Sequence, residues 1–155
     1  MKTVGLGLNF EDLPMGMKFK TIGRTLFESD LCGFVNVTHI VEVLFTNTEF
    51  VRLDSDIKGR LVPASLVYTF AEGLLVQSTM QMTAYAFLGM DLKVERPTFV
   101  GDTIHVECEV IESRLSKSRP GRGLVRTRNQ VVRQNGDVLL IYTPLRMVKC
   151  REVTQ

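Results

Sequence analysis

Few residues of this chain could move a proton near neutral pH, and the best placed of them are His39 and Glu42. They lie three residues apart in one segment, so an imidazole and a carboxylate could act there as a general acid and base. Histidine suits this chemistry because it changes charge near neutral pH. The other histidine, His105, falls on the polar side of an alternating strand pattern and is expected at the surface. The alternative is that His39 and Glu42 are polar residues of an ordinary loop.

Glu72 is a separate candidate for a carboxylate that acts as a base. It lies in the apolar stretch after Pro63, on a stripe with Ser65 and Thr69 that faces away from the apolar side. A carboxylate on a mostly buried helix could serve as a general base, because burial makes it more ready to take up a proton. The alternative is an exposed helix face or a hydrogen bond at an interface.

The segment from Ser113 to Gly136 is rich in basic residues and contains no acidic one. Its basic residues are Arg114, Lys117, Arg119, Arg122, Arg126, Arg128 and Arg133. Such a patch could bind phosphates or an acidic protein surface. Equally, it could be a solvated hairpin that balances the acids elsewhere in the chain. Nucleic acid is disfavoured as a partner, because no aromatic residue in this segment could stack on a base.

Length and composition indicate one globular domain spanning residues 1–155. Charged residues make up 23% of the chain and apolar residues 45%, and the net charge of +2 favours no class of partner. Cys32, Cys108 and Cys150 are widely spaced and indicate neither a disulfide framework nor a metal site. The apolar run Val4–Leu8 is too short for a signal peptide or a membrane span, so we expect a cytoplasmic protein without a membrane segment.

The hydrophobic pattern predicts a long helix between one strand and a series of antiparallel strands. Apolar residues recur in pairs four residues apart from Pro63 to Met82, which is typical of a helix, and its length of about 30 Å is enough to cross a sheet. We expect a strand at 19–27, a helix from a capping box at Thr25–Glu28 to about Val37, and an irregular stretch at 38–62. Further strands are expected at 85–94, 103–114, 123–133 and 138–149, with a tight turn at Asn135-Gly136. The predicted class is α+β, a sheet wrapped around a helix of about 63–82.

Five motifs occur in a definite order along the chain. They are Phe10-Glu-Asp-Leu13 with Gly16, Thr21-x-Gly23-Arg24-Thr25-x-x-Glu28-x-Asp30 with Phe34, Gly59-Arg-Leu-Val-Pro-Ala64, Pro97-Thr-Phe-Val-Gly-Asp-Thr103, and Ser116-Lys-Ser-Arg-Pro-Gly-Arg-Gly123. Together they cover most of the chain and resemble the MaoC-like hydratases and dehydratases, a hotdog-fold family. The resemblance implies a homodimer or higher homo-oligomer. It also implies reversible hydration of a 2-enoyl thioester of coenzyme A or acyl carrier protein to the 3-hydroxyacyl form.

The resemblance also assigns roles to single residues. The family takes its acid and base from a loop of the form Gly-Asp-x-Asn-Pro-x-His. Here His39 aligns with the glycine, Ile40 with the aspartate and Phe45 with the histidine. Glu42 aligns with the asparagine and Val43 with the proline. Neither Ile40 nor Phe45 can transfer a proton, so a hydratase of this sequence would use His39 and Glu42 instead.

Two further functions are compatible with the same fold but do not involve hydration. In the first, Ile40, Leu44, Phe45 and Phe50 form the wall of an acyl pocket, and the protein binds acyl thioesters without turnover or serves as a partner subunit. These apolar residues could equally belong to a core or a dimer interface. In the second, Glu72 acts as the base of a thioesterase.

The resemblance places the thioester carbonyl at the start of the long helix. Free backbone amides there can stabilise a developing negative charge, and Ala64 and Ser65 are the candidates. Lys117, Arg119 and Arg122 are the candidates for contact with the phosphates of coenzyme A or with an acyl carrier protein. Coenzyme A enters only as part of the substrate or ligand, and neither a metal nor another cofactor is expected.

Overall fold

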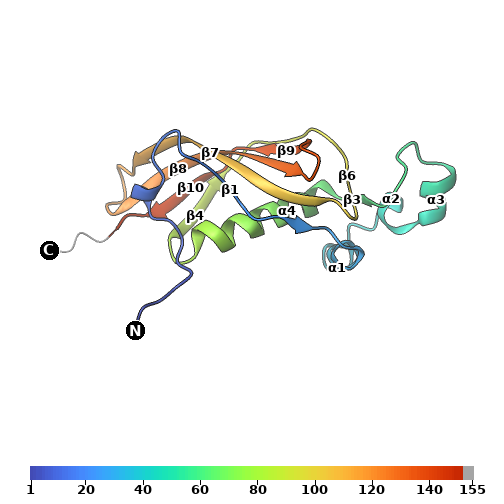
Figure 1. The fold of residues 1–155 in the computed structure, drawn as a ribbon, viewed down its shortest axis with the longest axis horizontal. Helices are drawn as coiled ribbons and strands as arrows, with labels where there is room; N and C mark the ends of the chain where they lie inside the picture. The colour runs from blue at the N-terminus through green and yellow to red at the C-terminus, as the bar shows by residue number, and fades with distance from the viewer. Residues whose placement is uncertain (152–155) are drawn as a thin grey trace.

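The computed structural model describes residues 1–151, and its core is an antiparallel sheet packed against one long helix (Figure 1). The strands are β1 (Lys18–Lys20), β2 (Arg24–Thr25), β3 (Leu61–Val62), β4 (Ala84–Gly89), β5 (Leu92–Val94), β6 (Thr98–Phe99), β7 (Thr103–Leu115), β8 (Arg122–Arg133), β9 (Val138–Tyr142) and β10 (Leu145–Lys149). The helices are α1 (Glu28–Thr38), α2 (Val43–Thr46), α3 (Thr48–Leu53) and α4 (Ala64–Leu75), with short segments η1 (Phe10–Asp12) and η2 (Val76–Met80). These elements confirm the predicted α+β class.

The main sheet has the strand order β1-β7-β8-β10-β4, and all of these pairings are antiparallel. β2 pairs with β7, β9 pairs with β8, and β5 pairs with β9. A separate two-stranded sheet joins β3 to β6 beside the start of α4. The long strands β7 and β8 are therefore the centre of the sheet, and α4 lies along one face of it (Figure 1).

The core lies between α4 and the sheet. The helix contributes the buried residues Leu66, Val67, Ala71, Leu74 and Leu75. One face of β7 carries Ile104, Val106, Cys108 and Val110, which are all buried. Each of the buried Leu, Ile and Val side chains contributes roughly 1.5–3 kcal/mol by leaving water, before the loss of conformational entropy is counted. Packing across this interface therefore holds the helix in place over the sheet.

The predicted turn at Asn135-Gly136 is confirmed and closes the β8–β9 hairpin. Gly136 has a φ of 90°, and its amide donates to the Arg133 carbonyl at 2.8 Å. A residue with a side chain is disfavoured at this φ, whereas glycine adopts it freely. This turn sets the register in which β9 pairs with β8.

The central helix is slightly shorter than the predicted range 63–82. α4 begins at Ala64, because Pro63 takes the cap position with an extended backbone of ψ 135°. The helix widens into the π segment η2 over its last turn and ends at Met80. Met82 then has a positive φ of 62°, which is incompatible with a continuing helix.

The prediction of a capping box at Thr25–Glu28 is wrong, because the cap of α1 lies two residues further along the chain. The carboxylate that caps α1 belongs to Asp30, which accepts a hydrogen bond from the Phe27 amide at 2.8 Å. The Thr25 hydroxyl instead lies 2.7 Å from the hydroxyl of Thr103 on β7. The hydroxyl is therefore used to join two strands rather than to begin the helix.

Three predicted strands are each divided into two. The range 19–27 contains β1 and β2, 85–94 contains β4 and β5, and 138–149 contains β9 and β10. Each division lets the two halves pair with different neighbours, since β4 pairs with β10 whereas β5 pairs with β9. Pro144 lies between β9 and β10 and has no amide hydrogen to donate to a ladder.

The stretch 38–62, predicted to be irregular, contains α2, α3 and β3, and the part with α2 and α3 projects from the body (Figure 1). Both helices begin with a side-chain cap. The Glu42 carboxylate accepts from the Leu44 amide at 2.7 Å, and the Asn47 side chain accepts from the Phe50 amide at 3.0 Å. Helices of four and six residues held by caps carry no hydrophobic period, so the sequence pattern does not reveal them.

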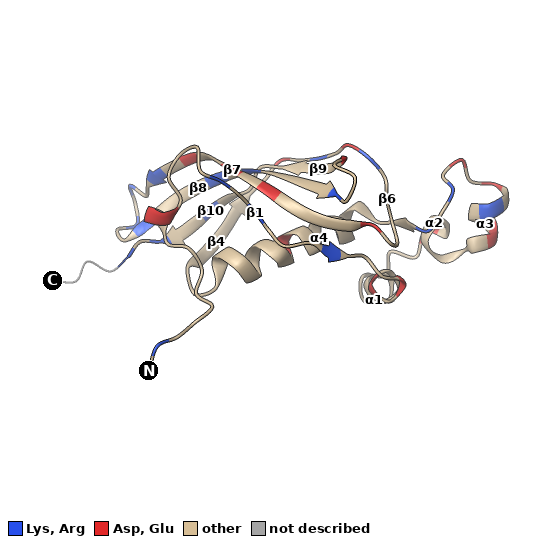
Figure 2. Cartoon of the chain, viewed as in Figure 1, with Lys and Arg blue, Asp and Glu red and all other residues tan. Residues whose placement is uncertain are grey.

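Charges lie mainly on the strands, loops and short helices, and Glu72 is the one charged residue of α4 (Figure 2). No helix within residues 1–151 combines the length and apolar character needed to cross a membrane. In the same part of the chain, no three His, Cys, Asp or Glu side chains are grouped so that they could hold a metal ion.

Candidate functional site

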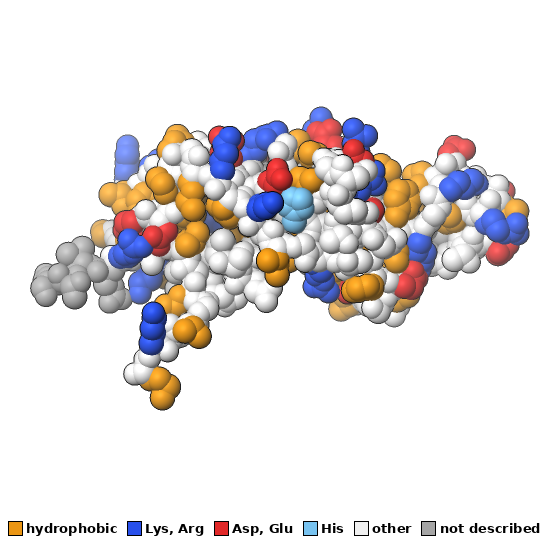
Figure 3. Space-filling view, viewed as in Figure 1, with side chains coloured by type: hydrophobic (Ala, Val, Ile, Leu, Met, Phe, Trp, Pro, Cys, Tyr) orange, Lys and Arg blue, Asp and Glu red, His pale blue; other side chains and the backbone are white. Residues whose placement is uncertain are grey.

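A hollow of about 270 Å³ opens at the start of α4, where the helix meets β3, β6 and the projecting segment. The residues that line it are Phe45, Ile57, Leu61, Val62, Pro63, Ala64, Val67, Val94, Arg96, Pro97, Thr98 and Leu140. Figure 3 shows apolar side chains gathered on the surface between the sheet and α3. The hollow is concave and mostly apolar, as small-molecule sites commonly are.

Polar groups are few in this hollow. Arg96 is its one charged residue, and no His, Cys, Asp or Glu side chain of the described chain lines it. The amides of Ala64 and Ser65 begin α4 and have no preceding helical turn to donate to. They place the positive end of the helix dipole at the edge of the hollow. The arrangement can bind a carbonyl or an anionic group, but its lining offers no group that exchanges a proton near neutral pH.

Phe45 reaches the hollow from α2 and packs against the core. Its amide donates to the Glu42 carbonyl at 2.9 Å, and its carbonyl accepts a hydrogen bond from Arg60. The Arg60 guanidinium also pairs with the Glu28 carboxylate at 2.6 Å, and its hydrogen bonds hold the pKa of that carboxyl below its usual range. Arg60 therefore ties α1 to α2 and fixes Phe45 as an apolar wall.

The other residues predicted to form an acyl wall lie elsewhere in the projecting segment. Ile40, Leu44 and Phe50 are half-buried, and none of them lines the hollow. Their place is taken by residues from distant parts of the chain, including Val67 on α4 and Leu140 on β9. These residues could not be associated with the site from sequence spacing, because only the folded sheet brings them together.

His39 ends α1 in the left-handed conformation, with φ 59° and ψ 26°. Its side chain is exposed, and its amide donates to the Val35 carbonyl at 2.9 Å. Glycine adopts this backbone without strain, whereas a residue with a Cβ is destabilised there by about 1 kcal/mol. The conformation is the one expected for the glycine with which His39 aligns.

Glu42 caps α2, and its exposed carboxylate is engaged with the Leu44 amide. No hydrogen bond joins Glu42 to His39 in the described chain, and neither side chain lines the hollow. The two candidate acid–base residues therefore lie on the segment that leads to Phe45 but are not assembled at the start of α4.

Solved structures with a similar fold include a MaoC-like dehydratase from Rhodospirillum rubrum, which is 27% identical with a TM-score of 0.82 over 95% of this chain and 100% of that one. The chain has a MaoC-like hotdog fold. An R-hydratase from Pseudomonas aeruginosa is 22% identical, with a TM-score of 0.77 over 96% of this chain and 93% of that one. A double-hotdog protein from Mycobacterium tuberculosis is 23% identical, with a TM-score of 0.86 over 99% of this chain and 47% of that one. No protein-family model and no curated protein matches the sequence.

Within this MaoC-like fold, Glu72 lies on α4 at a distance from the hollow. Both of its oxygens accept hydrogen bonds from Arg146 on β10, at 2.6 and 2.7 Å, and the two side chains are only 17% and 9% exposed. Glu72 is eight residues from Ala64, or about 12 Å along the helix. A carboxylate engaged in this way is poorly placed to act on a thioester held at the start of α4.

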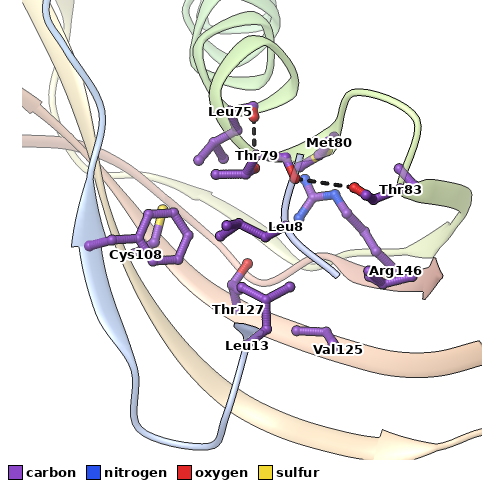
Figure 4. Close-up of a pocket in the computed structure, with 13 residues that line it drawn as sticks. Leu8, Leu13, Leu75, Thr79, Met80, Thr83, Cys108, Val125, Thr127 and Arg146 are labelled. Carbon is purple, nitrogen blue, oxygen red and sulfur yellow. Dashed lines mark hydrogen bonds between the residues drawn. The ribbon is translucent and has the colours of Figure 1, made fainter. Parts of the chain in front are cut away.

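A second cavity, of about 30 Å³, lies at the opposite end of the central helix (Figure 4). Figure 4 shows Leu8 of the N-terminal segment in the middle of its lining, between Cys108 and Arg146. The volume suits one or two water molecules and is far too small for an acyl chain. Burial raises the pKa of the Cys108 thiol to about 12, so this cysteine is held in its unreactive protonated form.

The basic hairpin with Lys117, Arg119 and Arg122 also lies at that opposite end. In the ladder between β8 and β10, Arg122 lies opposite Lys149. The Lys149 amide donates to the Thr83 carbonyl just beyond η2. α4 and η2 together span about 25 Å, so within one chain this hairpin does not reach the hollow. The position differs from the one expected for contact with a coenzyme A ligand, because the sequence does not show to which end of the helix a hairpin folds.

Several other bases of the same segment are paired with acids from outside it. Arg114 and Arg126 both bond to Glu112, at 2.8 and 3.2 Å, and Arg133 pairs with Asp137. These bonds hold the pKa of the Glu112 and Asp137 carboxyls below their usual range. The segment is therefore less positive as a surface than its sequence indicates (Figure 2).

Two polar residues of the hollow, Arg96 and Thr98, were not among the residues predicted for the site. Arg96 follows β5, and Thr98 begins β6. The signal that could have found them is the motif beginning at Pro97, because that motif leads to the strand that pairs with β3. The pairing of β3 with β6 brings this part of the chain to the start of α4.

Proposed function

We propose that the chain binds 2-enoyl and 3-hydroxyacyl thioesters of coenzyme A or an acyl carrier protein at the hollow beside α4. The thioester carbonyl accepts hydrogen bonds from the amides of Ala64 and Ser65, and the acyl group lies against Phe45 and Val67. The dehydratase and the R-hydratases among the solved structures with this fold support this class of ligand.

The lining of the hollow carries the proposal that the chain binds without hydrating. Hydration of an enoyl thioester needs one group to deprotonate water and another to protonate the α-carbon. Phe45 lines the hollow in the place that the family resemblance gives to a histidine, and Ile40 takes the place of the aspartate. Binding without hydration, alone or as the partner subunit of an active relative, is therefore the form of the function that this lining favours.

Hydration by His39 and Glu42 is the second candidate function. The strained backbone of His39 favours it, because left-handed residues other than glycine are concentrated at functional sites. The capping bond from the Leu44 amide weighs against it, because Glu42 would have to release this bond to reach a substrate. Hydrolysis through Glu72 has less support, since Arg146 engages both oxygens of that carboxylate.

Calorimetric titration with crotonyl-CoA tests the binding site itself. We expect saturable binding by the wild type and loss of binding in Val94→Asp, which places a negative charge on the exposed wall of the hollow. Leu115→Asp is the matched control, because Leu115 is also exposed but does not line the hollow. Equal affinities of the three proteins, or no binding by the wild type, would refute the proposed site.

A gain-of-function variant tests why hydration should be absent. We expect Ile40→Asp/Phe45→His to hydrate crotonyl-CoA, because it restores an acid and a base at the positions that the family uses. Ile40→Asn/Phe45→Gln is the control of similar shape that cannot transfer protons. Equal rates in the two variants would show that the restored groups are not what hydration lacks.

We also propose that two copies of the chain pair through β4. This strand is an edge of the main sheet and exposes Tyr85, Phe87 and Leu88. An exposed apolar edge strand normally requires a partner. The three cysteines are free, which supports the proposal that the protein works in the reducing cytoplasm.

A further inference from the structure

Arg96 is the one charged residue among those that line the hollow. Its side chain is 59% exposed, and its Nε atom lies 4.0 Å from the nearest oxygen of Asp137. Asp137 is itself bound by Arg133 and Asn135, and the bond from Arg133 is the main cause that holds the pKa of Asp137 below its usual range. Arg133 therefore binds Asp137 more closely than Arg96 does, although Arg133 also lies 3.7 Å from Asp102, and the exposed guanidinium of Arg96 gives up only a long ion pair when it turns to a ligand.

The lining of the hollow itself carries positive side-chain charge only, whereas Glu95 and Asp137 lie with Arg96 around a neighbouring surface hollow. No carboxylate of the described residues lines the hollow beside α4, and the start of α4 adds partial positive charge through the amides of Ala64 and Ser65. Arg96 and the helix end therefore act in the same direction on anything bound between them. An anionic group is stabilised there relative to a neutral group of the same shape.

The size of the hollow limits which part of a thioester can meet Arg96. Its volume is about 270 Å³, and both Arg96 and Ala64 line it. Arg96 and the amide of Ala64 are therefore walls of one small site. A thioester carbonyl held at Ala64 brings the far end of a short acyl chain to Arg96, whereas the phosphates of coenzyme A lie beyond the pantetheine arm.

We propose that Arg96 binds a carboxylate at the far end of a short acyl chain, so that the preferred ligands are thioesters of dicarboxylic acids. Arginine suits this role because its planar guanidinium donates two parallel hydrogen bonds to a carboxylate. The inference rests on the proposed function, which places the thioester carbonyl at the start of α4.

Calorimetric titration with succinyl-CoA and butyryl-CoA tests the inference, because these ligands differ by a carboxylate in place of a methyl group. We expect the wild type to bind succinyl-CoA at least about tenfold more tightly. In Arg96→Gln we expect this preference to disappear, because the affinity for succinyl-CoA falls at least about tenfold more than the affinity for butyryl-CoA. Arg96→Lys keeps part of the preference, because it retains the charge without the forked donors.

Lys93→Gln is the matched control, since Lys93 is 74% exposed, pairs with Glu95 at 2.8 Å and does not line the hollow. It should bind both ligands as the wild type does. An equal loss of affinity for both ligands in Arg96→Gln would indicate a contact with a phosphate of coenzyme A and overturn the inference. Equal affinities of the wild type for succinyl-CoA and butyryl-CoA would also overturn it. Absence of butyryl-CoA binding would instead refute the proposed function, so the two failures are distinguishable.

Discussion

At the scale of single residues, His39 and Phe45 stand at the positions that the family resemblance gives to the glycine and the histidine of a proton-transfer loop. His39 takes the left-handed backbone suited to glycine, and Phe45 is held by Arg60 as part of an apolar wall. Both residues are compatible with the loop as a structural element, because the hydrogen bonds that shape it come from backbone groups and from caps such as Glu42. The shape of the loop can therefore persist without its acid and base.

The strain at His39 predicts a stability change. We expect His39→Gly to raise the free energy of unfolding by roughly 1 kcal/mol, because glycine adopts φ 59° without steric cost. Val37→Gly, on the exposed side of the same helix, should lower it by several tenths of a kcal/mol. Urea unfolding measures both changes, and a His39→Gly variant no more stable than His39→Ala would contradict the account.

The buried thiol of Cys108 predicts how stability depends on pH. Burial raises its pKa from 9.0 to about 12, so the folded state favours the protonated thiol. The resulting stability is fully present below pH 9 and is lost as the pH rises from 9 towards 12. Between pH 8 and pH 10, the free energy of unfolding measured in urea should therefore fall less in Cys108→Ala than in the wild type. The exposed Cys32→Ala serves as control, and the same loss in all three proteins would disprove this cause.

At the scale of elements, the pair between Glu72 and Arg146 joins α4 to β10 across the core. Removal of one member leaves a mostly buried charge without its partner, so we expect Glu72→Leu to cost about 3 kcal/mol of unfolding free energy. The double variant Glu72→Leu/Arg146→Met should lie within about 1 kcal/mol of the wild type, because both charges are then gone.

An exposed ion pair gives the comparison for this measurement. Arg52 and Glu49 are 64% and 68% exposed, so Glu49→Leu should cost well under about 1 kcal/mol. Chemical unfolding of all the variants decides the question. A double variant as unstable as Glu72→Leu alone would show that the two charges do not act as a pair.

Elements with a strong hydrophobic period were the ones that the sequence predicted well. α4 and β7 follow from their apolar spacing, and the β8–β9 turn follows from Asn135-Gly136. The short helices α2 and α3 could not be predicted, because caps rather than periodicity hold them. Of the residues proposed for the site from sequence, Ala64 and Phe45 line the hollow. Arg96 and Leu140 enter it through strand pairing that no local pattern shows.

At the scale of the whole molecule, the unpaired edge at β4 predicts association of two copies. Phe87 is 50% exposed on this strand, and a charge there should separate the copies. We expect sedimentation to show a dimer for the wild type and a monomer for Phe87→Asp, with Leu115→Asp remaining dimeric. A monomeric wild type would exclude a dimer contact. A dimeric Phe87→Asp would show that the contact does not involve β4.

The family resemblance predicted the overall architecture correctly, whereas the end of α4 at which the basic hairpin lies did not follow from it. Five short motifs were enough to indicate the hotdog fold, because they occur in a definite order along most of the chain. The basic hairpin was expected near the ligand, but its position depends on which end of α4 it folds against. Such information is carried by strand order and not by spacing along the chain.

The most direct measurement is the rate of crotonyl-CoA hydration by the wild type under conditions where calorimetry shows the site to be saturated, with free thiol followed in the same samples. We expect bound ligand, constant enoyl-thioester absorbance and no release of coenzyme A, because no His, Cys, Asp or Glu side chain of the described residues lines the hollow. Hydration that disappears in His39→Ala or Glu42→Ala would contradict it and establish a relocated acid–base pair. Thiol release that disappears in Glu72→Gln would contradict it in favour of hydrolysis.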